Sequence, residues 1–183
     1  MHHTVFDKGF KILDSDKTYK YQEELTGKLD KLREEFDYNI LNEIVLWKVN
    51  RYSQFSQKTI DLINSIAYND KSIDQKKIRR VLRVLLKTPG VQIAMASTIL
   101  RFRNPQLFQI MDQRVYRIIN PGKTLKLSTS ESNINIENTI DIYLKYLEQL
   151  KKVASELKIE YKEADRVLYM ADRRINRKHK LSN

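Results

Sequence analysis

The residues with the clearest capacity for chemistry lie between positions 85 and 115. An apolar helical pattern stops at Thr88-Pro89-Gly90, because proline disfavours helix in the residue before it and glycine permits a sharp reversal. A second apolar helical pattern follows from Val91. The free N–H groups and the positive dipole end at the start of that helix would attract a phosphate. The pattern predicts a helix, a turn and a second helix that grip a DNA backbone without reading its sequence.

Asp112 is the first acidic residue that follows this turn in the sequence. It follows Gly90 by 22 positions and precedes the apolar residues Val115, Ile118 and Ile119. An aspartate before an apolar helical pattern is placed like an N-cap, which typically stabilises a helix by about 1 kcal/mol. The spacing therefore predicts a helix that begins directly after Asp112.

This segment resembles the helix-hairpin-helix superfamily of DNA glycosylases, the base-excision enzymes. The resemblance rests on Pro89, Gly90 and Val91 at the end of an apolar helix, on a following helix with small residues, and on Asp112. In detail it covers about residues 85–117, less than a fifth of the chain; elsewhere only the order of helices agrees. It implies an all-α, DNA-glycosylase-like fold, a multi-helix bundle that contains a helix-hairpin-helix motif.

The resemblance implies a catalytic role for Asp112. Its carboxylate would lie beside the sugar of a flipped-out nucleotide and stabilise the positive charge that builds as the base departs. Bifunctional members carry a lysine nucleophile where this chain has Ala94, so the implied activity is monofunctional hydrolysis of the N-glycosidic bond of a damaged or modified base. Gln92 replaces a second glycine of the family, which changes how closely the backbone can approach phosphate.

The sequence supports two hypotheses for Asp112, a helix cap and a catalytic carboxylate, and one residue can serve both roles. The alternative function is a helix-hairpin-helix module that binds DNA without catalysis. In both cases the expected partner is DNA, through its backbone phosphates and, in an enzyme, a flipped base.

Three groups of residues are candidates for contact with DNA. The set expected to bind the backbone is Thr88, Pro89, Gly90, Val91, Gln92, Arg101, Arg103, Arg114 and Arg117. A second basic group lies on the helix before the turn and consists of Lys76, Lys77, Arg79, Arg80 and Arg83. The end of an earlier helix supplies the candidate base pocket, Trp47, Asn50, Arg51 and Tyr52. An aromatic ring can stack on a base and an amide can read its edge, whereas the alternative for Trp47 is a place in the core.

Composition excludes several other kinds of site. The chain has no cysteine, which excludes disulfides, thiolate metal sites and iron–sulfur clusters, and its histidines, His2, His3 and His179, lie near the ends. We therefore expect no metal and no cofactor. No apolar stretch reaches the length of a signal peptide or a membrane span. The expectation is a cytoplasmic monomer without membrane contact.

Charge is concentrated in the middle of the chain. The net charge is +11, and residues 37–120 carry 14 basic against 6 acidic side chains. A polyanion could lie across this region, although a solvated basic surface would have the same composition. We expect one all-helical domain over residues 1–183. The alternative is two lobes, 36–120 with the hairpin and 1–35 together with 121–183.

Helices must position these residues. Only 4 glycines and 3 prolines occur in 183 residues, which disfavours turn-rich sheets. Apolar periodicity and caps predict helices over 16–35, 37–51, 56–67, 72–86, 91–101, 112 onwards, 136–157 and 161–177, with a loop over 120–135. Ser72 and Gln75 have the spacing of a capping box. The stripe of Ile140, Tyr143, Leu144, Leu147 and Leu150 suits core packing, or a partner if this is a helical interaction protein.

Overall fold

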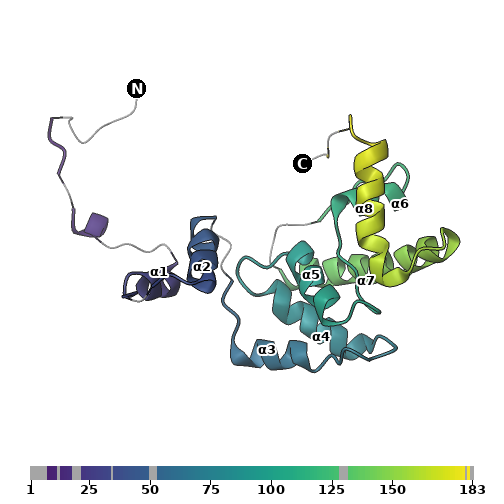
Figure 1. Cartoon of the computed structure of the whole chain (residues 1–183), viewed down its shortest axis with the longest axis horizontal. Coiled ribbons are helices and arrows are strands. Elements are labelled where there is room, and N and C mark those ends of the chain that lie inside the picture. The colour runs from purple at the N-terminus through teal and green to yellow at the C-terminus, as the bar shows by residue number, and fades with distance from the viewer. Residues whose placement is uncertain are drawn as a thin grey trace. The chain divides into compact units, whose positions relative to one another are not determined.

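The computed structural model describes residues 8–11, 13–17, 22–33, 35–49, 53–127, 132–179 and 181. Within these ranges all regular elements are helices (Figure 1), which confirms the all-α class. None of these helices combines the length and the apolar character needed to cross a bilayer. The chain divides into two compact units, Met1–Tyr52 and Ser53–Asn183. The sequence analysis predicted one domain over 1–183, and its two-lobe alternative placed boundaries near residues 36 and 120, whereas this division falls after residue 52.

The first unit contains a short 3-10 helix, η1 (Asp14–Lys17), and two α-helices, α1 (Glu23–Leu29) and α2 (Tyr38–Lys48). The predicted continuous helix over 16–35 is wrong, because Gln22 before α1 has a φ of 44°, outside the helical region. The predicted start of α2 is confirmed: the Asp37 carboxylate accepts a hydrogen bond from the Ile40 N–H at 2.7 Å.

The described part of the second unit contains α3 (Gln57–Asn64), α4 (Gln75–Leu86), α5 (Ile93–Arg103), α6 (Gln113–Ile119), α7 (Asn133–Glu156) and α8 (Ala164–Ile175), with a 3-10 turn, η2 (Tyr161–Glu163), before α8. Ser56 caps α3, as predicted. The predicted capping box at Ser72 is wrong, because Asp74 accepts hydrogen bonds from the Lys76 and Lys77 N–H groups at 2.9 and 3.0 Å. Helix α4 therefore begins two residues later than expected.

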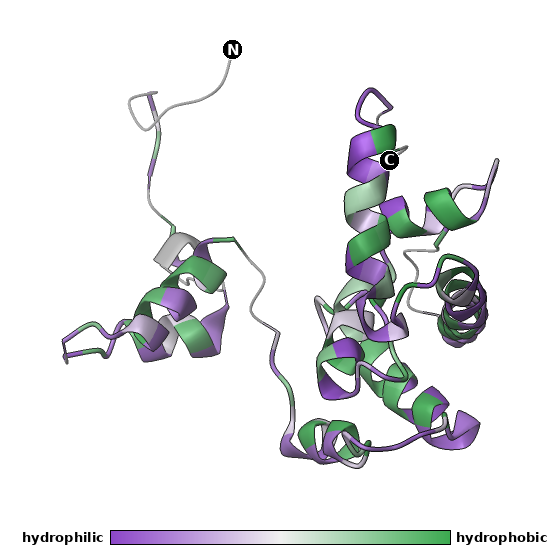
Figure 2. Ribbon diagram, turned by 45° about the vertical axis from the view of Figure 1, so that its right-hand side comes forward, coloured by the Kyte–Doolittle hydropathy of each residue, from purple (hydrophilic) through white to green (hydrophobic). Residues whose placement is uncertain are grey.

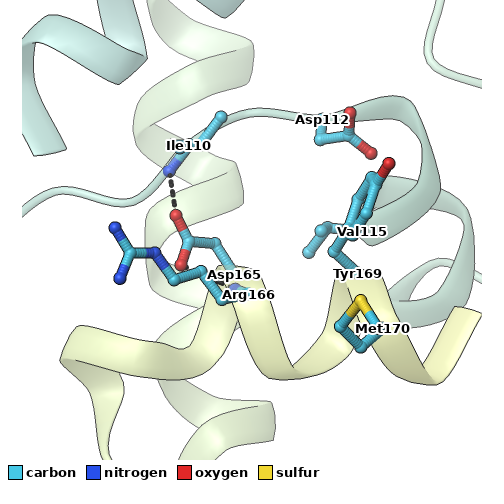
Figure 3. A pocket seen from close by; sticks show the side chains of 7 residues that line it. All are labelled: Ile110, Asp112, Val115, Asp165, Arg166, Tyr169 and Met170. Carbon is cyan, nitrogen blue, oxygen red and sulfur yellow. Dashed lines mark hydrogen bonds between the residues drawn. The ribbon is translucent and has the colours of Figure 1, made fainter.

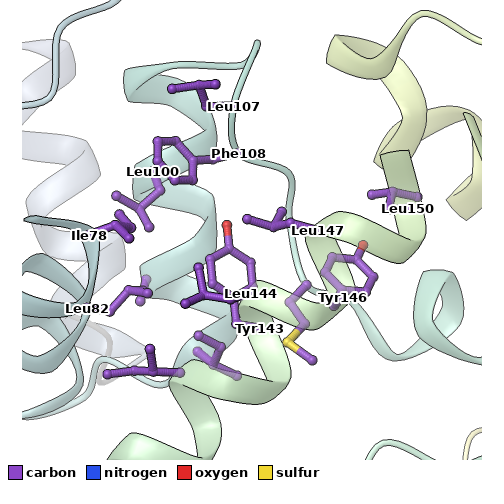
Figure 4. Packing of buried hydrophobic residues seen from close by; sticks show 14 of the residues in the cluster. Ile78, Leu82, Leu100, Leu107, Phe108, Tyr143, Leu144, Tyr146, Leu147 and Leu150 are labelled. Carbon is purple, nitrogen blue, oxygen red and sulfur yellow. The ribbon is translucent and has the colours of Figure 1, made fainter. Parts of the chain in front are cut away.

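The core of the second unit lies between α4, α5 and α7. The helices of this unit carry both apolar and polar residues (Figure 2), and an apolar face of a helix packs toward the core. Buried side chains of α7 pack toward Ile78 and Leu82 of α4 and Leu100 of α5 (Figure 4). The whole apolar stripe of α7 predicted from the sequence is buried. The core interpretation of that stripe is therefore right, and the partner-binding interpretation is wrong.

Between α5 and α6 the chain runs as an irregular segment through the core. Leu107, Phe108 and Met111 are buried, although the segment has no regular secondary structure. It ends at Asp112, which begins α6. The path of this segment therefore sets where the Asp112 carboxylate lies.

Candidate active site

Asp112 lines an open pocket of about 370 Å³ between the segment before α6 and helix α8 (Figure 3). Val115 of α6 and Tyr169 and Met170 of α8 are among the residues that form its walls. The exposed wall surface is almost entirely apolar. A cavity of this size and character is typical of sites for small organic groups, so the pocket can hold a single nucleobase.

The Asp112 carboxylate caps α6 with one oxygen. Its Oδ1 accepts a hydrogen bond from the Arg114 N–H at 2.7 Å, which confirms the predicted cap. In the part of the chain that the structure describes, Oδ2 accepts no hydrogen bond. The side chain is half-buried and lies at the pocket wall. The cap therefore engages only Oδ1 of the carboxylate among the described residues.

A second carboxylate, Asp165, lines the same pocket, and each of its oxygens accepts a hydrogen bond from the protein backbone. It is 2 % exposed. Its Oδ2 accepts from the Ile110 N–H at 3.0 Å and its Oδ1 from the Arg166 N–H at 2.7 Å, while Arg101 Nε lies 4.0 Å from Oδ2. Asp165 thus supports the pocket wall and is not placed to act on a substrate.

Arg114 and Arg117 of α6 are tied to a buried carboxylate of α8. Arg117 donates from Nε and Nη2 to the two oxygens of Asp172, at 2.7 and 2.8 Å, and Arg114 Nη1 donates to Oδ2 at 3.3 Å. The hydrogen bonds from Arg117 lower the pKa of Asp172 from its ordinary value and raise the pKa of Arg117 itself. These ion pairs join the two helices that flank the pocket. The Arg114 and Arg117 side chains stay 29 % and 20 % exposed.

Arg101 and Arg103 have structural partners. Arg101 is 6 % exposed, and its Nη2 donates to the Lys162 carbonyl at 3.0 Å. Arg103 donates to the carbonyls of Ile66 and Asn64 at 2.6 and 3.0 Å, at the end of α3. Both guanidinium groups therefore bind the protein's own carbonyls.

The predicted turn joins α4 to α5. Thr88 Oγ1 donates to the Val84 carbonyl at 3.0 Å, and Gly90 has a φ of +80°, which favours glycine. Val91 is 4 % exposed and packs in the core, so its side chain is not available to DNA. Gln92 is exposed and makes no side-chain hydrogen bond to the first turn of α5.

The second basic group is partly neutralised by α7. Arg79 pairs with Asp141, and Arg83 Nε donates to Glu137 at 2.6 Å. Lys77 Nζ donates to the carbonyl at the end of α3 at 3.3 Å. Lys76 and Arg80 are exposed. These two are therefore the members of the group best placed to meet a phosphate.

The structure describes one of the four predicted base-pocket residues, Trp47. Trp47 is half-buried in the first unit, where its Nε1 donates to Thr26 Oγ1 at 2.9 Å, whereas the pocket lies within the second unit. Asn50, Arg51 and Tyr52 lie outside the described residues.

Four of the residues that line the pocket, Asp165, Arg166, Tyr169 and Met170, come from α8. The sequence analysis predicted this helix but not its part in the site. One signal was present: Asp165, Leu168 and Asp172 share a helical face, and all three are buried. Carboxylates on an inward face require buried partners, so this face could have been recognised as paired with arginines.

Among the described residues, no cluster of three His, Cys, Asp or Glu side chains could hold a metal ion. The arrangement that the structure does provide is a half-buried carboxylate at an apolar pocket, with arginines on the flanking helices. Comparison with protein-family models, with curated proteins and with solved structures finds no match for this chain.

Proposed function

We propose that this protein binds DNA and hydrolyses the N-glycosidic bond of a damaged or modified base without cleaving the strand. The observation that supports the proposal is the place of Asp112. Its carboxylate lines an open apolar pocket, and its cap to α6 engages Oδ1. A carboxylate held in this way meets the chief electrostatic requirement of the reaction.

The chemistry needs a fixed negative charge. As the glycosidic bond breaks, positive charge develops on the sugar, and a carboxylate stabilises it most where apolar walls lower the local dielectric constant. Water then adds to C1′, and a proton passes to the departing base. Because Ala94 stands where a lysine nucleophile would be needed, water is the nucleophile in this proposal.

The pocket walls suit an extruded base. Tyr169 presents an aromatic ring, and Met170 and Val115 add apolar surface, so a base can stack there instead of on its neighbours in the duplex. The Arg114 and Arg173 guanidinium carbons lie 5.9 and 6.0 Å from the centre of the Tyr169 ring. Their positive charge favours a polyanion next to the pocket.

The turn between α4 and α5 is the proposed anchor for the phosphodiester backbone. The first turn of α5 has no side-chain cap from Gln92, so its N–H groups and the helix dipole are available for a phosphate. Thr88, Pro89 and Gly90 form the turn itself, and Lys76 and Arg80 add exposed charge on α4. Contacts of this kind position a protein on DNA without reading its sequence.

A pair of abasic-site analogues tests the proposal without knowledge of the base. One duplex carries a protonated pyrrolidine nucleotide, which mimics the cationic sugar, and the other carries a neutral tetrahydrofuran nucleotide. We expect the wild type to bind the pyrrolidine duplex about 10- to 100-fold more tightly, since an enzyme binds the transition state better than the ground state. Asp112→Asn should abolish this preference but keep the tetrahydrofuran affinity. Equal wild-type affinity for the two duplexes would refute a catalytic carboxylate.

The second candidate is DNA binding without catalysis. The observation that favours it is the hydrogen bond from the Arg114 N–H to Asp112, which gives the carboxylate a structural role that needs no substrate. This candidate predicts salt-sensitive binding of duplex DNA, no preference for the pyrrolidine analogue, and no release of any base.

A further inference from the structure

In the irregular segment before Asp112, side chains supply the hydrogen bonds that backbone groups supply in a helix or a strand. Two successive peptide groups are involved, the one between Gln109 and Ile110 and the one between Ile110 and Met111. Buried peptide groups need hydrogen-bond partners, and here side chains of three different helices supply them. We call these four side chains, Ser97, Tyr143, Tyr146 and Asp165, the clamp.

Each of the two peptide groups is held from both sides. For the first, the Tyr143 hydroxyl donates to the Gln109 carbonyl at 3.0 Å, and Asp165 accepts from the Ile110 N–H at 3.0 Å. For the second, the Tyr146 hydroxyl donates to the Ile110 carbonyl at 2.7 Å, and Ser97 Oγ accepts from the Met111 N–H at 3.0 Å. A peptide plane with both polar groups bonded cannot rotate without breaking one of them.

The clamp side chains are themselves fixed. Tyr143, Ser97 and Asp165 are at most 2 % exposed, and the Tyr146 ring is stacked with the rings of Tyr116 and Tyr143, at centroid distances of 6.5 and 6.4 Å. Ser97 Oγ donates its proton to the Ala94 carbonyl at 2.9 Å, so its lone pairs face Met111. Burial raises the pKa of Tyr146 well above its ordinary value, which keeps the hydroxyl a donor.

Asp112 is therefore held from two directions. The clamp fixes the peptide groups before it, and the hydrogen bond from the Arg114 N–H fixes its own Oδ1. Catalytic groups need placement to within a fraction of an ångström, because a shift of about 1 Å can lower a rate by about 100-fold.

We propose that Ser97, Tyr143, Tyr146 and Asp165 are positioning residues, which hold the segment before Asp112 so that its carboxylate faces the pocket. This inference rests on the proposed function. It goes beyond it by assigning a role to four buried polar side chains that act on the backbone before Asp112 and not on the substrate.

The test uses Tyr146→Phe and Ser97→Ala, which each release one side of the peptide group between Ile110 and Met111. The matched control is Tyr161→Phe. That hydroxyl donates at 3.5 Å to the Leu107 carbonyl, on the same segment but five residues before Asp112. Phenylalanine removes one hydroxyl hydrogen bond to this segment in both tyrosine variants, at 2.7 Å for Tyr146 and 3.5 Å for Tyr161, so Tyr161→Phe should destabilise the fold no more than Tyr146→Phe does.

The readout is the ratio of affinities for the tetrahydrofuran and pyrrolidine duplexes, measured together with the melting temperature. We expect Tyr146→Phe and Ser97→Ala to lower the wild-type preference for pyrrolidine by about tenfold, with unchanged affinity for tetrahydrofuran. Tyr161→Phe should keep the full preference for the pyrrolidine duplex, whatever its change in melting temperature. A merely structural role would change the melting temperature in all three variants but not the ratio.

The outcomes separate the inference from the proposed function. If the wild type prefers pyrrolidine, Asp112→Asn loses the preference, and the two clamp variants keep it, the clamp does not position Asp112. A loss of preference in Tyr161→Phe equal to that in Tyr146→Phe would also overturn the inference. If the wild type itself shows no preference, the proposed function fails first.

Discussion

Replacement of Asp172 by asparagine should loosen the two helices that flank the pocket. The carboxylate of Asp172 is fully buried and accepts four hydrogen bonds, two from Arg117, one from Arg114 and one from Asn176. Asparagine keeps nearly the same volume but loses the negative charge, and its amide group offers a donor where guanidinium donors already point. The substitution therefore removes the pairing without creating a cavity.

The size of the effect follows from burial. Removal of one partner of a fully buried ion pair typically costs about 3–5 kcal/mol. The arginine side chains here are 29 % and 20 % exposed, so water can partly replace the lost carboxylate. We expect a loss of about 2–3 kcal/mol in the free energy of unfolding. For a unit of this size, that corresponds to a fall of roughly 6–12 °C in melting temperature.

Urea unfolding followed by circular dichroism, together with a thermal scan, measures this loss. The matched control is Glu156→Gln, because Glu156 pairs with Lys152 at 3.9 Å in a largely exposed position on α7. Pairs of that kind contribute less than about 1 kcal/mol. If Asp172→Asn is no more destabilising than Glu156→Gln, the ion pairs of Asp172 do not hold α6 to α8 and the reasoning is refuted.

Three further predictions concern acid, the turn and the charged surface. The bonded Asp172 has a lowered pKa, so its stabilisation is complete above about pH 4 and is lost as the pH falls through that lowered value; melting temperatures at pH 5, 4 and 3 should fall more steeply in the wild type than in Asp172→Asn. Gly90→Ala should lower the free energy of unfolding by about 1–2 kcal/mol, because φ is +80° and the new Cβ would lie 3.3 Å from Ser53 Oγ. Gly27→Ala inside α1 should instead raise that free energy by about 0.5–1 kcal/mol. Equal urea midpoints for the two variants would contradict this prediction. Arg80→Ala should weaken duplex binding and reduce the slope of log Kd against log salt concentration by about one. Arg103→Ala should lower the stability of the fold instead. A loss of stability in both variants with unchanged DNA affinity would contradict the proposed phosphate contact of Arg80.

The sequence predicted the first residue of a helix well where a capping side chain determines it. Asp37, Ser56 and Asp112 each begin a helix because the capping bond joins residues only two or three apart in sequence. The start of α4 was misjudged because Ser72 and Asp74 both have capping side chains, and only the geometry shows that Asp74 reaches the N–H groups.

Contacts between distant residues account for what the sequence did not reveal about the site. Arg117 and Asp172 are 55 positions apart, as are Ile110 and Asp165. Sequence reasoning assigned Arg114 and Arg117 to DNA because a cluster of arginines next to Asp112 is equally consistent with phosphate contact and with an internal ion pair. The structure shows the internal ion pairs with the buried Asp172 of α8, which form because α6 packs against α8, and the question of phosphate contact stays a prediction.

The central claim is that the carboxylate of Asp112 promotes release of a base, and direct measurement of base release tests it most sharply. Duplex and single-stranded oligonucleotides that contain uracil, hypoxanthine, 8-oxoguanine or 3-methyladenine are incubated with excess wild type or Asp112→Asn, and alkali then cleaves the strand at each abasic site. Asparagine is as good a helix cap as aspartate, so the substitution removes the charge and keeps the fold. We predict alkali-dependent cleavage at one of these bases by the wild type and a loss of at least about 100-fold in the variant. Equal rates for the two proteins would contradict the account.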